Sequence, residues 1–344
     1  MKKTLIALAA LAAFGSASAE VTLYGKVDVG LLNETTTNAI DQGLQVKGNN
    51  YETSRFGIKG GSDLGAGIKA VFQLEQGFNL ADGSDKANNL TFNRVAMGGL
   101  TGSFGTVSAG LQWSPYDSAW GWDSNEYNGF SAANYVFYAG SHGDNGTGGF
   151  GNVKNSIQYT TPDFNGFNAS LMYANGADKT ATQSATTYVG FGANYAKGPL
   201  NVNFGYESVP SSKQLGTTLT AQGDKTTAYI LGASYNLGVA TIGGAYEQAN
   251  VDALGASGKD AGYTFGVSFP VSKQTTLAAN YASETTTAAG LTDGTAKGFG
   301  AQVIYNWTTQ MAVYGGVVQT KTTPLASTTE TTYTKYAAGI RYNF

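Results

Sequence analysis

Apolar and polar residues alternate along most of the chain with a period of two. On one face of each stretch the side chains are apolar or aromatic, and on the other they are polar or absent at glycine. This periodicity predicts β-strands with a single apolar face. The clearest stretches are 21–32, 67–78, 166–174, 200–207, 263–269 and 335–344.

Strand length helps to separate the two folds that such strands can build. A soluble sandwich turns the apolar faces inward and a membrane barrel turns them outward to lipid, so alternation alone fits both. The expected strands run about 9–12 residues, which is the length that a tilted membrane strand needs. Strands of soluble proteins average about 5–6 residues. The length therefore favours a transmembrane barrel.

The connections alternate between short and long, and their number gives the strand count. Seven are tight turns rich in Gly, Pro, Asn and Asp, and eight are long and polar. Together they join sixteen strands and place both chain ends on the short-turn side, as in barrels with short periplasmic turns and long extracellular loops. The predicted fold class is therefore an all-β, 16-stranded antiparallel transmembrane β-barrel. The long connections are 33–50, 80–90, 114–151, 175–186, 208–224, 249–260, 285–296 and 320–332.

Residues 1–19 have the features of a targeting segment. Lys2 and Lys3 precede a short apolar run, and Ala17-Ser18-Ala19 matches a signal-peptidase site. The apolar run is too short to span a bilayer. We therefore predict a cleaved signal peptide over 1–19 and a single barrel domain over 20–344.

Composition narrows the function classes. Charged residues make up only 12% of the 344 residues, against about 25% in average soluble proteins. Outside the N-terminal segment there is no apolar run long enough for a membrane helix. The net charge of −3 argues against a nucleic-acid partner. The lack of Cys excludes disulfides and thiol chemistry.

Sixteen strands are enough to leave a water-filled channel through the barrel. Two other functions are also compatible with a barrel. A barrel-scaffold outer-membrane hydrolase would commonly need a histidine base, and the single histidine, His142, lies in a glycine-rich loop with Ser141 and Asp144. We expect it to be an ordinary loop residue, and we expect no catalytic residue, cofactor or metal. An adhesin or structural barrel with a plugged lumen would need an extra domain, for which the chain has little room.

Several short motifs along the whole mature chain resemble those of Gram-negative general porins of the beta-proteobacterial subgroup. The resemblance implies a homotrimer of sixteen-stranded barrels in the outer membrane, in contact with lipid and lipopolysaccharide. It implies passive diffusion of ions and small hydrophilic solutes through a pore that the third long loop, 114–151, narrows by folding inward. The motifs are VTLYG at 21–25, SRFGIKG at 54–60, DLGAGIKA at 63–70, FQLE at 72–75, GSFGTV at 102–107, NSIQY at 155–159 and YNF at 342–344.

Charged residues on the inward parity and in the third loop are candidates for the pore constriction. The third loop contains acids and neither Lys nor Arg. A basic wall facing this loop would create a field across the pore, and rings of charged side chains are one way in which pores select ions. The wall candidates are Arg55, Lys59, Lys69 and Lys154, and the loop candidates are Asp117, Asp123 and Glu126.

The resemblance assigns three further roles. It places Arg55 and Arg94 in the constriction cluster, and it makes Phe344 a barrel assembly signal. Alternation puts Arg94 on the lipid face with Ala96, so a pore role requires a bulge or a position beyond the apolar band. A third family arginine is absent near Asn152, which leaves Lys154 as a substitute and the sign of the ion selectivity open.

Overall fold

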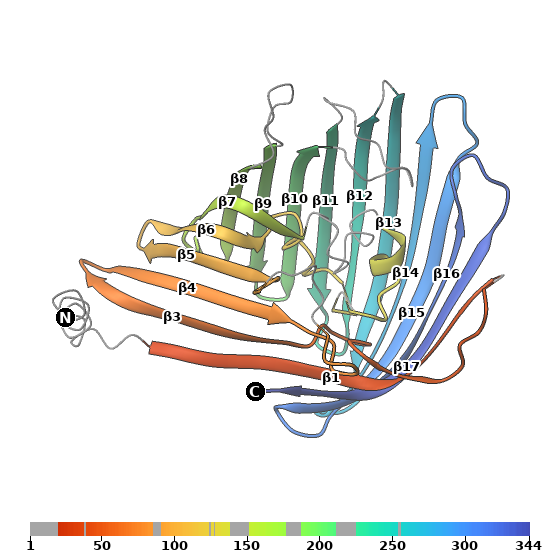
Figure 1. The fold of residues 1–344 in the computed structure, drawn as a ribbon, viewed down its shortest axis with the longest axis horizontal. Coiled ribbons are helices and arrows are strands. Elements are labelled where there is room, and N and C mark those ends of the chain that lie inside the picture. Colours follow the sequence, from red (N-terminus) through yellow and green to blue (C-terminus); the bar gives the residue numbers. More distant parts are fainter. Residues whose placement is uncertain are drawn as a thin grey trace, which may run out of the picture.

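The computed structural model describes residues 20–37, 39–84, 91–123, 125–126, 128–137, 151–176, 187–210, 225–253 and 256–344. These residues form a single large antiparallel sheet and one short helix, α2 (Ala133–Val136) (Figure 1). The strands are β1 (Glu20–Thr36), β2 (Gln45–Gly48), β3 (Arg55–Gly65), β4 (Ile68–Gly77), β5 (Val95–Gly102), β6 (Gly105–Trp113), β7 (Asn152–Thr160), β8 (Phe167–Asn175), β9 (Thr187–Lys197), β10 (Leu200–Pro210), β11 (Lys225–Asn236), β12 (Thr241–Ala253), β13 (Ala256–Pro270), β14 (Thr275–Ala288), β15 (Gly294–Asn306), β16 (Met311–Thr323) and β17 (Thr331–Asn343).

The sheet closes on itself through the first and last strands. Residues 20–26 of β1 pair with β3, and residues 26–36 pair with β17. Every other wall strand pairs with its neighbours in sequence, which gives a closed wall of sixteen strands. Closure leaves no unpaired edge to face lipid. The predicted 16-stranded antiparallel barrel is confirmed.

The short strand β2 fills a gap in this wall. It pairs with residues 29–32 of β1, beside the part of β1 that lies beyond the end of β3. Residues 49–54 connect β2 to β3, and three of the six, Asn50, Tyr51 and Ser54, are buried. We call residues 49–54 the insert. The expected loop 33–50 includes β2 and the first two residues of the insert, and the sequence predicted no strand there.

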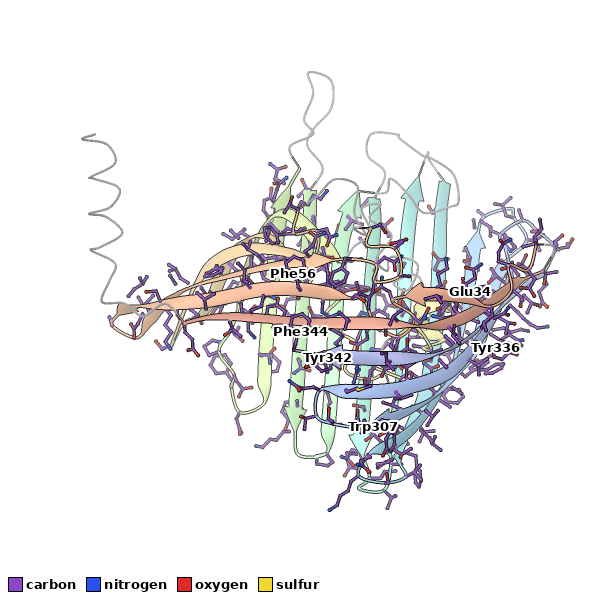
Figure 2. The ribbon with its side chains drawn as sticks, turned by 60° about the horizontal axis from the view of Figure 1, so that its bottom comes forward. Glu34, Phe56, Trp307, Tyr336, Tyr342 and Phe344 are labelled. Atoms are coloured by element: carbon purple, nitrogen blue, oxygen red, sulfur yellow. The ribbon has the colours of Figure 1, made fainter. Side chains whose placement is uncertain are left out.

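Side chains along the wall strands alternate between outward and inward positions, as the sequence predicts. Large apolar side chains point outward and are exposed, including Leu23 at 62% and Phe265 at 60%. Figure 2 shows Phe56, Tyr336 and Tyr342 among these outward side chains. A barrel with an apolar exterior and polar inward positions is suited to lipid outside and water inside.

Several strands extend further than the alternation predicted. β12 and β13 pair as far as Ala253 and Ala256, so most of the expected loop 249–260 is strand. β14, β15, β16 and β17 likewise continue into the expected loops 285–296 and 320–332. The extensions of β14, β15, β16 and β17 consist mainly of Thr, so the backbone ladder continues there without an apolar pattern.

No helix among the described residues has the length and apolarity of a membrane span. Residues 1–19 lie outside the described residues, so the signal peptide stays a prediction.

Candidate pore constriction

The insert is held inside the barrel by one carboxylate of β1. Asp28 is fully buried and accepts hydrogen bonds from the backbone N–H groups of Asn50, Tyr51 and Glu52 at 3.0–3.2 Å. Its Oδ1 also accepts a hydrogen bond from the Tyr314 hydroxyl at 2.8 Å. A buried carboxylate is tolerated when its acceptor sites are filled in this way. The result is a fixed turn that presents Glu52 to the lumen.

Glu52 forms ion pairs with cations on both of the strands that close the barrel, β1 and β17. Lys26 Nζ on β1 lies 2.5 Å from Glu52 Oε1, and Arg341 Nη1 on β17 lies 2.7 Å from Glu52 Oε2. The Arg341 guanidinium also stacks over the Tyr51 ring at 5.1 Å. Tyr51 in turn donates a hydrogen bond to Glu126 of the third loop at 2.9 Å.

A second carboxylate, Glu75 on β4, continues the cluster along the wall. Arg94 Nε lies 2.7 Å from Glu75 Oε1, and Arg55 Nε lies 3.9 Å from Glu75 Oε2. Arg55 Nη2 is also 4.0 Å from Glu52, so Arg55 links the two carboxylates. The Arg94 guanidinium packs on the Trp113 ring at 4.9 Å. We call Lys26, Glu52, Arg55, Glu75, Arg94 and Arg341 the charged band; it contains four cations and two carboxylates.

The cations of the band change the acidity of Glu52. Burial alone would raise the pKa of this carboxyl group, but the charges of Lys26 and Arg341 outweigh burial and hold the pKa below its usual value. Tyr51 shows the opposite effect, since burial and the neighbouring Glu126 charge raise the pKa of its hydroxyl. Glu52 is therefore ionised, and Tyr51 neutral, at neutral pH.

The third loop packs against inward-facing glycines of β11, β12, β15 and β16. We call its described part, residues 114–137 without 124 and 127, the third-loop segment. The Trp122 ring lies directly on Gly232, and the Trp122 carbonyl lies on Gly243. Phe130 occupies the same kind of position on Gly300 and Gly316. A side chain at these positions would collide with the loop. The segment can therefore pack against the wall only because these positions are glycines. In Figure 1 the yellow segment with α2 runs in front of the teal strands.

Aromatic side chains hold the third-loop segment against the wall. Trp120 and Trp122 lie 5.1 Å apart, and Phe137 completes the group at 6.2 Å from Trp122. Trp122, Phe130 and Phe137 are all at most 2% exposed. Burial of aromatic rings contributes much of the energy of a packed interface.

Lys335 on β17 connects the segment to the insert. Its ammonium group donates to the carbonyls of Asn50 at 2.9 Å and Gly129 at 3.1 Å. It also lies 5.3 Å from the Phe130 ring centroid. This buried cation thus joins the two pieces of chain that border the lumen.

The three predicted loop acids lie in different places. Glu126 is exposed and meets the charged band through Tyr51. Asp123 instead faces β14, where it accepts a hydrogen bond from Asn280 at 3.2 Å, and it accepts another from Ser131 of the segment at 2.5 Å. Asp117 is partly buried near the start of the segment, where its backbone N–H donates to Ser114.

Of the predicted basic residues, Arg55 and Arg94 lie together in the charged band. Arg94 precedes the first residue of β5, so the strand alternation does not govern it, and its side chain reaches Glu75 on the inward parity of β4. Lys59 lies four residues along β3 from Arg55, which is ~13 Å towards the short turns. It sits 5.3 Å from the Tyr24 ring. Lys69 is further away, beside the turn between β3 and β4.

Lys154 stands at a β-bulge that the sequence did not reveal. The register between β6 and β7 shifts between Gly110 and Gln112, and Asn155 has a positive φ of 54°. Val153 packs against the inward cluster of Met172 and its neighbours. The alternation is therefore interrupted between Lys154 and Ser156, and the argument that gave these two residues one face does not hold across the bulge.

Four members of the charged band were not among the residues predicted from the sequence. Lys26, Arg341 and Glu75 occupy inward positions of their strands, so the alternation already contained a signal for them. Glu52 had no such signal, because it lies in the insert outside any alternating stretch. The insert's position depends on hydrogen bonds to Asp28, which is distant in sequence.

No group of three or more His, Cys, Asp or Glu suited to a metal ion occurs in the described part of the chain. His142 and Asp144 lie outside the described residues. The expectation that His142 is an ordinary loop residue therefore stays a prediction.

A scan of family models matches residues 5–325 to the Gram-negative porin model. The chain belongs to the Gram-negative porin family. Among its relatives is outer membrane porin protein 32 of Delftia acidovorans, which is 36% identical over 286 residues, covering 79% of this chain and 76% of the relative. The porin is also 33% identical to an outer membrane porin protein of Bordetella pertussis, over 75% of this chain and 72% of the relative.

Solved porin structures share the fold. An anion-selective porin from Comamonas acidovorans is 27% identical, with a TM-score of 0.76 over 95% of this chain and 100% of its own. A trimer form of OmpT from Vibrio cholerae is 18% identical, with a TM-score of 0.68 over 95% and 99% of the two chains, and supports the fold alone.

Family membership establishes the general function. The protein is an outer-membrane porin, a channel of the Gram-negative cell envelope. The family is non-enzymatic, so the hydrolase alternative is set aside. The predicted beta-proteobacterial character is confirmed by the relatives from Delftia, Bordetella and Neisseria.

Proposed function

We propose that this porin is a diffusion channel for small hydrophilic solutes that prefers anions. The supporting observation is the charged band, in which, among the residues that the structure describes, four cations meet two carboxylates. Arg55 has the longest ion-pair distances of the four, 3.9 and 4.0 Å, and its side chain is 24% exposed, so it is well placed to attract a passing anion. The anion-selective character of the Comamonas porin is consistent with this proposal.

In this proposal the lumen is narrowest between the charged band and the third-loop segment. Glu126 and Tyr51 form the contact between the two sides. Asp123 is held at another part of the wall, where Asn280 of β14 and Ser131 of the segment donate hydrogen bonds to its carboxylate.

The test is the reversal potential of the purified porin in a planar bilayer under a KCl gradient. We expect the reversal potential to have the sign that chloride permeation produces. Its magnitude should be larger at low salt, because the charges of the pore are screened less there. A reversal potential of the cation-selective sign would contradict the proposal.

We further propose that the porin is a homotrimer embedded in outer-membrane lipid and lipopolysaccharide. We expect the unheated protein to migrate as an oligomer in SDS gels, and to shift to the monomer position on heating. Single insertions in a bilayer are expected to close in three equal conductance steps. A monodisperse monomer that needs no detergent would contradict both parts.

A further inference from the structure

The outer surface of the barrel carries an apolar groove over β10–β15. Its volume is about 780 Å³, within the range of small-molecule pockets. The outward residues at its floor are small: Ala233, Gly244, Ala279 and Ala301. Because these residues carry little side chain, the wall is thin here and the surface is hollow.

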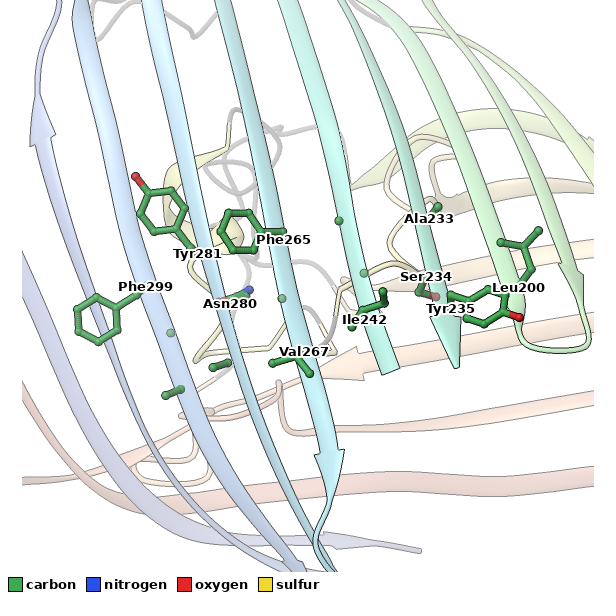
Figure 3. A pocket seen from close by; sticks show the side chains of 16 residues that line it. Leu200, Ala233, Ser234, Tyr235, Ile242, Phe265, Val267, Asn280, Tyr281 and Phe299 are labelled. Atoms are coloured by element: carbon green, nitrogen blue, oxygen red, sulfur yellow. The ribbon is translucent and has the colours of Figure 1, made fainter. Parts of the chain in front are cut away.

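Aromatic rings border the hollow. Tyr235, Phe265, Tyr281 and Phe299 project from neighbouring strands around the small residues (Figure 3). The rings belong to the outward parity, and Phe265 is 60% exposed. The groove therefore opens away from the lumen, towards the hydrocarbon of the membrane.

The groove lies in the half of the wall next to the short turns. Leu200 is the first residue of β10, and Phe299, the lining residue furthest from the turns, lies seven residues before the end of β15. At about 3.3 Å per residue this is ~23 Å along the strand, and a tilt of about 45° reduces it to ~16 Å along the membrane normal, about half of a hydrocarbon core of ~30 Å. Short turns of such barrels are periplasmic, so the groove faces the periplasmic leaflet.

The turns below the groove carry positive charge and no acid. Lys197 and Lys273 are exposed there, and the connections 198–199, 237–240, 271–274 and 307–310 contain neither Asp nor Glu. By contrast, the turn between β7 and β8 carries Asp163, and at the turn between β3 and β4 Asp63 lies opposite Lys69. Trp307 is 64% exposed beside the groove, as is typical of residues at a membrane interface.

We propose that this groove binds a phospholipid of the periplasmic leaflet. Its hydrocarbon chains lie over the small outward residues between the aromatic rings. Its phosphate lies at Lys273, in the turn directly below the middle of the groove, and Lys197 adds positive charge at the edge. The site is separate from the pore, so it does not depend on the ion selectivity proposed above.

The test uses the full porin in nanodiscs that contain phosphatidylglycerol with a photoreactive acyl chain. After illumination, labelled peptides are mapped by mass spectrometry. We expect labelling concentrated on β12–β15, and loss of that labelling in A279L/A301L, where larger side chains fill the groove. The matched control is A169L/A193L, which alters outward alanines of β8 and β9 outside the groove and is expected to keep the labelling.

The headgroup contact is tested by Lys273→Gln, with Lys321→Gln at the loop end of β16 as control. Only Lys273→Gln is expected to reduce labelling of the groove. Uniform labelling of the exterior that neither set of variants changes would overturn the proposal. Loss of the oligomer in A279L/A301L would also overturn it, because the groove would then be an interface between copies. Channel conductance, measured on every variant, shows separately whether the pore is intact.

Discussion

Arg55 illustrates how single residues divide between the two faces of the wall. It begins β3, where Phe56 and Ile58 point outward and Gly57 and Lys59 share its parity. Its guanidinium lies between Glu52 and Glu75 without a close ion pair to either. A change at Arg55 therefore alters the pore charge and leaves the lipid-facing surface unchanged.

We predict that Arg55→Gln shifts the reversal potential towards cations. Charges interact over a Debye length of ~10 Å at 0.1 M salt, so the shift should be largest in dilute KCl. Glu126→Gln is expected to shift the potential the opposite way. Lys321→Gln removes the same charge at the exposed ion pair with Glu330 and serves as the control. An unchanged potential in Arg55→Gln, with normal oligomers, would place Arg55 outside the constriction.

The lowered pKa of Glu52 predicts a pH dependence. Because the folded-state pKa lies below the unfolded value, the pairing stabilises the barrel above the ordinary carboxyl range, and this stabilisation is lost as pH falls through the folded pKa. We expect constant selectivity from neutral pH to about pH 4, the usual glutamate value. Below it, anion selectivity should rise as Glu52 loses its charge.

Glu52→Gln provides the check on this assignment. At neutral pH the variant is expected to be more anion-selective than the unaltered porin, and its acid-induced change should be smaller. An acid transition of equal size in both proteins would assign the titration to other carboxyl groups of the lumen.

At the scale of elements, the third-loop segment depends on the absence of side chains from the wall. β11, β12, β15 and β16 each present an inward glycine where Trp122 or Phe130 lies. Ordinary strand propensity disfavours glycine, so its repeated occurrence here reflects the close approach of the loop. The loop position is thus encoded in strands that are distant from it in sequence.

We predict that Gly232→Val displaces the third-loop segment from the barrel wall while the barrel still forms. The added side chain would occupy the place of the Trp122 ring, and single-channel current should become noisier. Gly315→Val is the control, because Gly315 faces outward and a Cβ there meets nothing closer than 3.8 Å. Trp122→Ala should act like Gly232→Val, since loss of a buried Trp costs about 3–5 kcal/mol. Quiet, unchanged currents in both variants would show that the segment is held elsewhere.

At the scale of the whole molecule, the closing seam between β1 and β17 determines whether a barrel exists. The last residue takes part in it: Phe344 exchanges backbone hydrogen bonds with Gly25 at 2.9 and 3.0 Å, and its ring lies over Gly25. Figure 2 shows Phe344 beside Tyr342 and near Phe56 on the outer surface. Lys26, Glu52 and Arg341 meet at the same seam, so closure also assembles half of the charged band.

We predict that deletion of Phe344 lowers the yield of folded barrel in the outer membrane. The deletion removes the last backbone pair of the seam and the ring that covers Gly25. Trp307→Leu, which alters another exposed aromatic near the short turns, is expected to keep the yield. Equal yields for the deletion and the unaltered porin would contradict a role of Phe344 in assembly.

The sequence by itself determined the wall of the barrel. Strand alternation depends on which face meets lipid, and this is a local property that each stretch carries independently. The count of turns and loops gave sixteen strands, and inward parity identified Arg55. The polar strand extensions beyond the apolar band were missed, because their mainly polar residues carry no apolar alternation.

Only the tertiary structure decided what lies inside the wall. Glu52 enters the lumen because Asp28 holds the backbone of the insert, and Arg94 reaches Glu75 because it precedes the strand whose parity would have turned it outward. The bulge at Asn155 interrupts the pattern on which Lys154 was assigned. These positions depend on hydrogen bonds, ion pairs and ring contacts between residues that are far apart in sequence, and no local periodicity records such contacts.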